Sequence, residues 1–129
     1  MSVEVINPGS LSRGSYSHAI VVGGGRLVFV SGQVSVDGTG KVVGTTFEAQ
    51  AEQVFANLAT VLTAAGARWQ DVVKMNVYVR DLTSAKVKLF REIRQRHLLD
   101  HQPASTLVAT PGLVHEDMML EVEVVAHIA

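Results

Sequence analysis

The feature that most constrains this fold is a switch between two hydrophobic periods along the chain. Over residues 45–65, apolar residues recur at helical spacing, whereas over 72–79 and 119–128 they alternate with other residues. A period near 3.6 indicates one buried face of a helix, and a period of 2 indicates a half-buried strand. The chain must therefore combine helices and strands around one core.

Local signals at both ends define the first predicted helix. Thr45 and Glu48 have the spacing of a capping box, which predicts that the helix begins there. Gly66 is suited to the left-handed conformation that ends a helix. The residues predicted to form its buried face are Phe47, Ala51, Val54, Phe55, Leu58, Val61, Leu62 and Ala65.

A second helix is predicted to begin at a Thr83 or Ser84 cap and to end near His97. Its apolar set is Val87, Phe90, Ile93 and Leu98. Its basic residues, which we assign to the exposed side, are Lys86, Lys88, Arg91, Arg94 and Arg96. Because no aromatic residues are interleaved for base stacking, we interpret this side as a solvated face and not as an RNA-binding surface.

The remaining segments predict strands. A hairpin is indicated by residues 17–22 and 26–33, which flank three glycines. A short segment begins after a turn at residues 42–43. The last two predicted strands are residues 105–110 and 119–128. Residues 72–79 are predicted to turn Val73, Met75, Val77 and Val79 to one face. We therefore expect one α+β domain over residues 1–129, with two helices covering one face of a single mixed sheet.

Composition narrows the classes of function. The chain has no cysteine, which excludes disulfides, thiolate catalysis and cysteine-based zinc sites. The net charge is −1, so no global basic field attracts nucleic acid. No secretory signal and no apolar run of membrane-spanning length is visible, so we expect a cytoplasmic protein without a membrane partner.

Two glutamates in the last strand are the first candidates for chemistry. Glu121 and Glu123 lie two residues apart on the same strand face, a separation of about 7 Å. Paired carboxylates on a mostly apolar face suit general acid–base work, and they also suit a solvated or salt-bridged surface. Both interpretations stay open. His97 and His101 have the spacing of helical metal ligands, but the predicted helix ends between them, so we expect no metal site.

Seven short motifs, in order and at matching spacing, make the chain resemble the Rid (RidA/YjgF, endoribonuclease L-PSP) family along nearly its whole length. They are residues 16–19 (YSHA), 27–33 (LVFVSGQ), 50–58 (QAEQVFANL), 71–74 (DVVK), 76–82 (NVYVRDL), 103–104 (PA) and 120–123 (LEVE).

The resemblance implies a chorismate-mutase-like fold, three subunits packed around an axis, and small-molecule sites in the clefts between them. Family deaminases hydrolyse enamines and imines to a keto acid and ammonia without a metal or organic cofactor. The resemblance assigns the catalytic, water-activating position to Glu121. It assigns substrate-binding positions to Tyr16, Ser31, Ser105 and Thr106.

The chain departs from the family at Ser105, where family deaminases carry the arginine that grips the substrate carboxylate. A serine donates one neutral hydrogen bond, whereas arginine offers a charged fork. We therefore expect either an imine deaminase with an altered substrate range or a metabolite-binding trimer without turnover. Ribonuclease or translation-inhibitor activity is a less favoured third function. Whether another arginine, such as Arg13, Arg26 or Arg80, replaces the missing one stays open.

Overall fold

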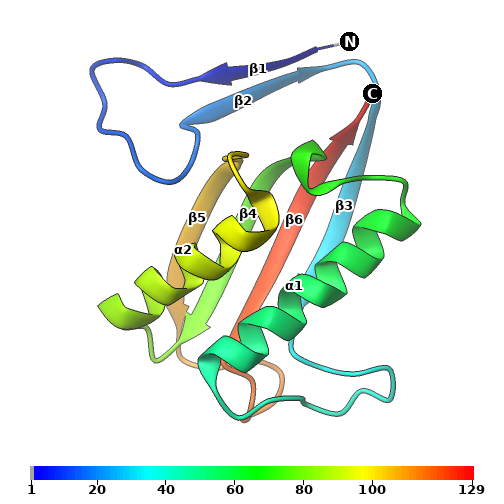
Figure 1. The fold of residues 1–129 in the computed structure, drawn as a ribbon, viewed down its shortest axis with the longest axis vertical. Coiled ribbons are helices and arrows are strands. Elements are labelled where there is room, and N and C mark those ends of the chain that lie inside the picture. The colour runs from blue at the N-terminus through cyan, green and yellow to red at the C-terminus, as the bar shows by residue number, and fades with distance from the viewer. Residues whose placement is uncertain (1) are drawn as a thin grey trace.

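The computed structural model describes residues 2–129 (Figure 1). Its elements are β1 (Ser2–Ile6), β2 (Ala19–Gly23), β3 (Arg26–Gln33), α1 (Phe47–Ala64), a short 3-10 helix (Trp69–Asp71), β4 (Val72–Arg80), α2 (Ser84–Leu98), β5 (Ala104–Thr110) and β6 (Leu120–Ile128).

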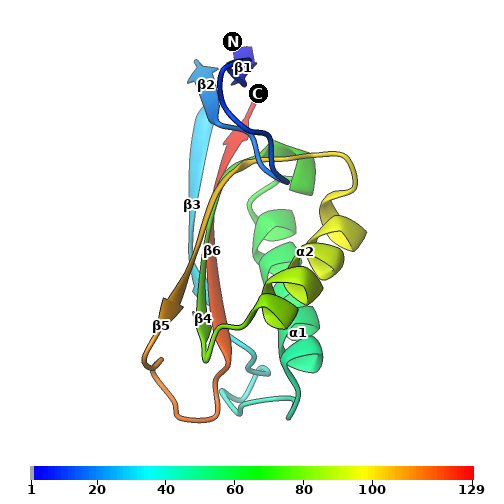
Figure 2. The same cartoon turned by 90° about the vertical axis from the view of Figure 1, so that its left-hand side faces the viewer.

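The main sheet has four strands in the order β3-β6-β4-β5, with β4 and β5 parallel and the other pairs antiparallel. Helices α1 and α2 lie together on one face of it, and the opposite face carries no helix of the described residues (Figure 2). The predicted α+β two-layer architecture, a mixed sheet covered on one face by two helices, is confirmed. We call the uncovered side the open face.

The expected hairpin over residues 17–33 is wrong. Strand β2 pairs with β1 instead of β3, and the two form a separate two-stranded sheet that extends across the end of the molecule (Figure 1). Gly24 and Gly25 both have left-handed φ angles, 67° and 69°, which favour glycine and turn the chain from this arm into β3. His127 holds the turn, with its Nε2 2.7 Å from the Gly24 carbonyl oxygen. The segment at 42–43 contributes only an isolated bridge from Val42 to Val36.

The core lies between the helices and the sheet. Phe55 and Leu58 of α1, Phe90 of α2 and Met75 of β4 are fully buried, as the helical and strand periods predict. Val73 is an exception, because a register shift between Val72 and Lys74 disrupts the alternation at the start of β4. Val72 is therefore fully buried instead, while Val73 is only half-buried.

Helix α1 begins one residue later than the predicted capping box requires. Thr46 is the N-cap, and its Oγ1 accepts a hydrogen bond of 3.1 Å from the Ala49 backbone N–H. Glu48 therefore lies in the first turn and cannot reciprocate; its carboxylate is 3.5 Å from Arg96. The other predicted ends are confirmed, since Thr83 caps α2 and Gly66 adopts a left-handed φ of 81° after α1.

Among the described residues, no helix combines the length and apolar character that crossing a membrane requires.

Candidate functional site

The Glu121 carboxylate lies on the open face, against the backbone of β3. Its neighbours Leu120 and Val122 are fully buried on the helix-covered side, so strand alternation turns Glu121 the other way. A Cβ added at Gly32 would lie 2.8 Å from the Glu121 Cδ, closer than real side chains approach. The missing side chain at Gly32 therefore makes room for this carboxylate, at an irregularity in the β3–β6 pairing between Val30 and Gln33.

Glu123 is engaged differently from Glu121, although the two share a strand face. The Tyr78 hydroxyl donates a 2.7 Å hydrogen bond to Glu123 Oε1, so the partner of Glu123 is a phenol and not a basic residue. This bond raises the pKa of Tyr78, with smaller contributions from burial and the two carboxylates. No side-chain hydrogen bond or ion pair of Glu121 is seen within residues 2–129. Glu121 is thus the carboxylate left available for a ligand.

The start of β6, and with it Glu121, is anchored by the buried amide of Gln50 on α1. Its Oε1 accepts from the Met119 backbone N–H at 2.8 Å. Its Nε2 donates to the carbonyl oxygens of Asp117, at 2.8 Å, and Gly44, at 3.1 Å. A fully buried amide with these bonds fixes the loop before β6. Sequence reasoning matched Gln50 only as part of a motif and did not foresee this role.

A second group of predicted site residues lines a cavity of about 300 Å³ beneath α2. It contains Tyr16 and Ser105, together with Arg91 and Arg94 of α2. The other lining residues are Ser15, Leu82, Val87 and Leu107. We call this space the Ser105 cavity.

Register places Ser105 and Thr106 on opposite faces of the sheet. Ser105 pairs with the fully buried Met75, so it shares the helix-covered side. Thr106 is exposed, and its Oγ1 accepts a 3.3 Å hydrogen bond from the Lys74 ammonium. Ser31 is also exposed and immediately precedes Gly32. Within one chain the structure brings Tyr16 to Ser105 but does not bring either of them to Glu121.

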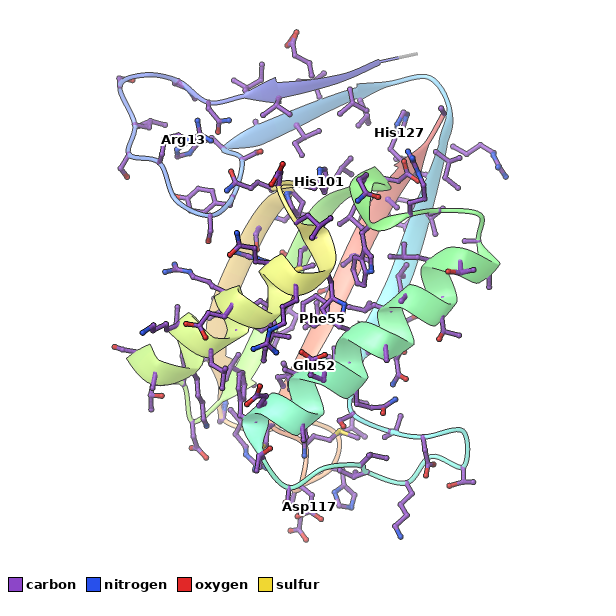
Figure 3. All side chains as sticks on the ribbon, in the orientation of Figure 1. Arg13, Glu52, Phe55, His101, Asp117 and His127 are labelled. Atoms are coloured by element: carbon purple, nitrogen blue, oxygen red, sulfur yellow. The ribbon has the colours of Figure 1, made fainter. Side chains whose placement is uncertain are left out.

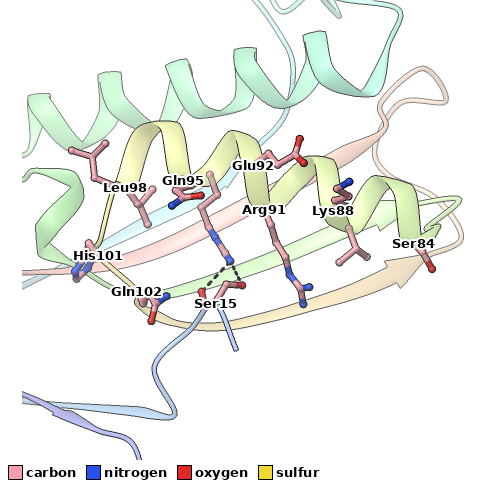
Figure 4. Close-up of a pocket in the computed structure, with 12 residues that line it drawn as sticks. Ser15, Ser84, Lys88, Arg91, Glu92, Gln95, Leu98, His101 and Gln102 are labelled. Atoms are coloured by element: carbon pink, nitrogen blue, oxygen red, sulfur yellow. Dashed lines mark hydrogen bonds between the residues drawn. The ribbon is translucent and has the colours of Figure 1, made fainter. Parts of the chain in front are cut away.

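Arg94 corrects the assignment of all the basic residues of α2 to its exposed side. It is only 9% exposed. Its Nη2 donates to the Ser15 carbonyl oxygen at 3.0 Å and to the Ser15 hydroxyl at 2.7 Å, as the dashed lines in Figure 4 show. Burial lowers its pKa, and the nearby Arg91 charge adds to the effect. The i, i+4 spacing from Phe90 through Arg94 to Leu98 is the signal that sequence reasoning missed.

The three arginines considered as replacements lie elsewhere. Arg13 belongs to the loop between β1 and β2 (Figure 3), and Arg26 is exposed at the start of β3. Arg80 donates to the Glu116 carbonyl oxygen and lies 3.8 Å from the Asp81 carboxylate. None of the three lines the Ser105 cavity.

The two histidines near the end of α2 have structural contacts. The His97 ring stacks on Phe55 at 4.9 Å between centroids, and its Nε2 is 3.3 Å from Glu52 Oε2. The Nε2 of His101 lies 2.6 Å from the Val72 carbonyl oxygen. Figure 3 labels His101 together with Glu52 and Phe55. In the part of the chain described, no three His, Asp or Glu side chains cluster as metal ligands.

Comparison with known proteins shows which family this chain belongs to. The family described as Endoribonuclease L-PSP matches residues 9–128. A RutC family protein of Pyrococcus abyssi is 35% identical over 116 residues, 88% of this chain and 87% of the relative. The crystal structure of YyfB from Yersinia pestis, of the Rid family, superposes with a TM-score of 0.92 at 30% identity over 99% of this chain and 100% of that chain. RidA from an Antarctic Psychrobacter gives 0.73 at 34% identity, with 92% of each chain covered. The chain therefore belongs to the Rid (YjgF, endoribonuclease L-PSP) family.

Proposed function

We propose that this protein hydrolyses a small enamine or imine in clefts between the subunits of a homotrimer, without a metal or organic cofactor. Glu121 is the general base, and Ser31 and Thr106 line its side of the cleft. Tyr16 and Ser105 bind the substrate. The observation that carries the proposal is the Glu121 carboxylate, seated over Gly32 with no competing partner in the described chain.

The positions of these residues support an assembled site. Glu121 is on the open face, and the Ser105 cavity is on the helix-covered side beside β5, at the edge of the sheet. Since a sheet separates the two groups within one chain, a neighbouring copy must supply one of them. The exposed apolar residues Leu27 and Phe29 of β3 support the open face as the surface that meets the neighbour.

The chemistry needs one proton acceptor near water. Glu121 accepts a proton from water while the water oxygen bonds to the imine carbon, and the nitrogen takes up a proton from solvent to give a carbinolamine. The protonated Glu121 then gives its proton to the amine nitrogen as the C–N bond breaks and ammonia leaves, and the hydroxyl group loses its proton to solvent as the carbonyl forms. A carboxylate that is partly removed from water and held in one place suits this role.

The paired variants Glu121→Gln and Glu123→Gln test the proposal. An amide keeps the shape of the side chain but cannot accept the proton, so Glu121→Gln should lower the rate about 10²- to 10⁴-fold. Glu123→Gln should retain most activity, because Glu123 is engaged by Tyr78. The assay measures keto-acid release from imines generated in situ from a panel of amino acids. Equal losses of activity in the two variants, or a larger loss in Glu123→Gln, would show that Glu121 is not the general base.

A non-catalytic trimer that binds a small metabolite is the second candidate, and Ser105 in place of arginine favours it. If no imine in the panel is turned over while a keto acid binds, the binding function replaces the enzymatic one. Ribonuclease activity is disfavoured, since the open face presents the carboxylates of Glu121 and Glu123, which repel phosphate.

We further propose that the protein is cytoplasmic and that its partners are a small molecule and further copies of the chain. The absence of cysteine from the sequence fits a reducing compartment, and the net charge of −1 provides no basic field to attract nucleic acid. Cell fractionation with an antibody to the chain tests the location.

A further inference from the structure

We infer that the arm formed by β1 and β2 is exchanged between copies of this chain, so that β2 of one copy adds a strand to the outer edge of β3 in the next. The surface is the edge of β3 (Arg26–Gln33), and its occupant is β2 (Ala19–Gly23) of a second copy. The inference goes beyond the proposed function, which requires a neighbouring copy on the open face but gives the arm no role.

The arm lacks a third strand. Among the described residues, β1 and β2 pair only with each other. Val3 and Val5 lie on one face of this ribbon, because they alternate with the residue between them. Val21 pairs with that residue, Glu4, and so lies on the opposite face. All three valines are more than half exposed. Because an isolated two-stranded sheet is only marginally stable in water, the arm gains stability from a strand paired along the free edge of β2.

The outer edge of β3 is the surface that matches this need. Within residues 2–129, β3 pairs only with β6, so its other side presents unpaired backbone groups. Proteins usually protect such an edge with charged residues or proline, but residues 27–33 contain neither. Leu27 and Phe29 are exposed on the same strand. An unprotected edge with apolar side chains beside it favours the addition of a strand.

The arm is held across the end of its own sheet. At one end, the Ser17 N–H donates to the Pro103 carbonyl oxygen at 3.2 Å, next to the start of β5. At the other end, His127 holds the turn at Gly24, beside β3. From β5 to β3 the sheet is three strand spacings wide, about 14 Å, and the five residues of β2 span about 16 Å. Strand β2 therefore reaches from one edge of the sheet to the other (Figure 1).

This position prevents β2 from pairing with β3 of the same chain. A hairpin with a two-residue glycine turn would place Ala19 opposite Val30, part of the way along β3. Ser17 would then lie at the β3 edge, away from Pro103 at the β5 edge. The observed contacts and a hairpin within one chain therefore exclude each other. The β3 of a second copy meets no such conflict, so the pairing that the glycine-flanked strands favour can form between chains.

An engineered disulfide tests this pairing, since the chain has no cysteine of its own. In the register of a hairpin, Val21 lies opposite Val28 with Cα atoms about 5.5 Å apart, which a disulfide can bridge. Neither valine is fully buried, so cysteine at both positions should leave the fold intact. After oxidation, the double variant Val21→Cys, Val28→Cys should run on non-reducing gels as covalent species of two or three chains. Mass spectrometry should locate the bond between positions 21 and 28 of different chains.

The matched control is the double variant Val3→Cys, Val28→Cys. Val3 is as exposed as Val21, but it lies on β1, one strand further from the partner's β3. Two strand spacings separate its Cα from that of position 28 by about 10 Å, too far for a disulfide. This variant should give at least about 10-fold less covalent product. The single variants Val21→Cys and Val28→Cys control for bonds between identical positions.

Three results of the disulfide test would overturn the inference. They are a bond within one chain, which shows a hairpin, no bond in the folded double variant, and an equal yield in the control. Hydrogen exchange of the wild-type protein is an independent measure. Amides of β3 that point away from β6 should exchange about 100-fold or more slowly than in an unfolded chain, and fast exchange would show an uncovered edge. Neither measurement involves turnover, so failure of the catalytic proposal leaves both intact.

Discussion

At the residue scale, Gly32 determines where the Glu121 carboxylate can lie. Both the Cγ and the Cδ of Glu121 occupy space that a side chain at position 32 would need, with separations of 3.0 and 2.8 Å from an added Cβ. Because this end of Glu121 is flexible, a methyl group there should displace the carboxylate without breaking the strand.

We therefore expect Gly32→Ala to lower the rate of imine hydrolysis about 10- to 100-fold, since a small misplacement of a catalytic group is enough for such a loss. Gly38→Ala is the matched control, because an added Cβ there meets nothing within 4 Å. Steady-state assays give the rates, and thermal melting checks that both variants fold. If Gly32→Ala retained full activity, the position of Glu121 over Gly32 would not matter for catalysis.

At the element scale, the start of α1 shows that one hydroxyl determines a helix boundary. Thr45 and Thr46 are adjacent and chemically identical, but only Thr46 accepts the Ala49 N–H. No hydrogen bond of the Thr45 side chain is present in the part of the chain that the structure covers. Phe47, the first helical residue, is buried, and this fixes which threonine precedes the helix.

Thr46→Ala should lower the free energy of unfolding by about 1 kcal/mol, because loss of the cap leaves the Ala49 backbone N–H without its hydrogen-bond partner. Thr45→Ala should change it by less than about 0.5 kcal/mol, as substitutions of exposed residues usually do. Urea denaturation at one fixed protein concentration measures both, since an oligomer's stability depends on concentration. Equal effects of the two substitutions would mean that Thr45 also caps the helix, as the predicted capping box requires.

At the scale of the whole molecule, the open face presents apolar side chains to solvent. Phe29 is 75% exposed at the centre of β3, with Leu27 beside it at 50%. Phe29 pairs in register with Val125 of β6, on the same face as Glu121. An exposed aromatic residue on the same sheet face as the candidate catalytic carboxylate is what an interface that completes the site requires.

We expect Phe29→Lys to convert a trimer to monomers at micromolar concentration and to abolish hydrolysis together with assembly. Loss of an aromatic anchor typically costs an interface about 2 kcal/mol or more, and the change recurs at each contact of a ring. Val114→Lys is the control, because Val114 is 92% exposed in the loop before β6. Sedimentation velocity measures the assembly; a wild-type monomer or a trimeric Phe29→Lys variant would contradict the prediction.

The sequence by itself determined the local structure of this protein. Hydrophobic period identified both helices and the strands at residues 72–79 and 119–128, and Thr83 and Gly66 marked helix ends, because these signals act within a few residues of the chain. Alternation in β6 also turned Glu121 and Glu123 away from the core. Motif order identified the family, which the comparisons confirm.

Only the tertiary structure decided which elements meet. The pairing of β2 with β1 instead of β3 depends on a glycine turn whose direction no local pattern specifies. The burial of Arg94 depends on Ser15, 79 residues away in the chain. The division of the candidate site between two faces depends on the register of β5 with β4. Such contacts join residues far apart in sequence, and local periodicity fixes the face that a side chain takes but not the neighbour that it finds there.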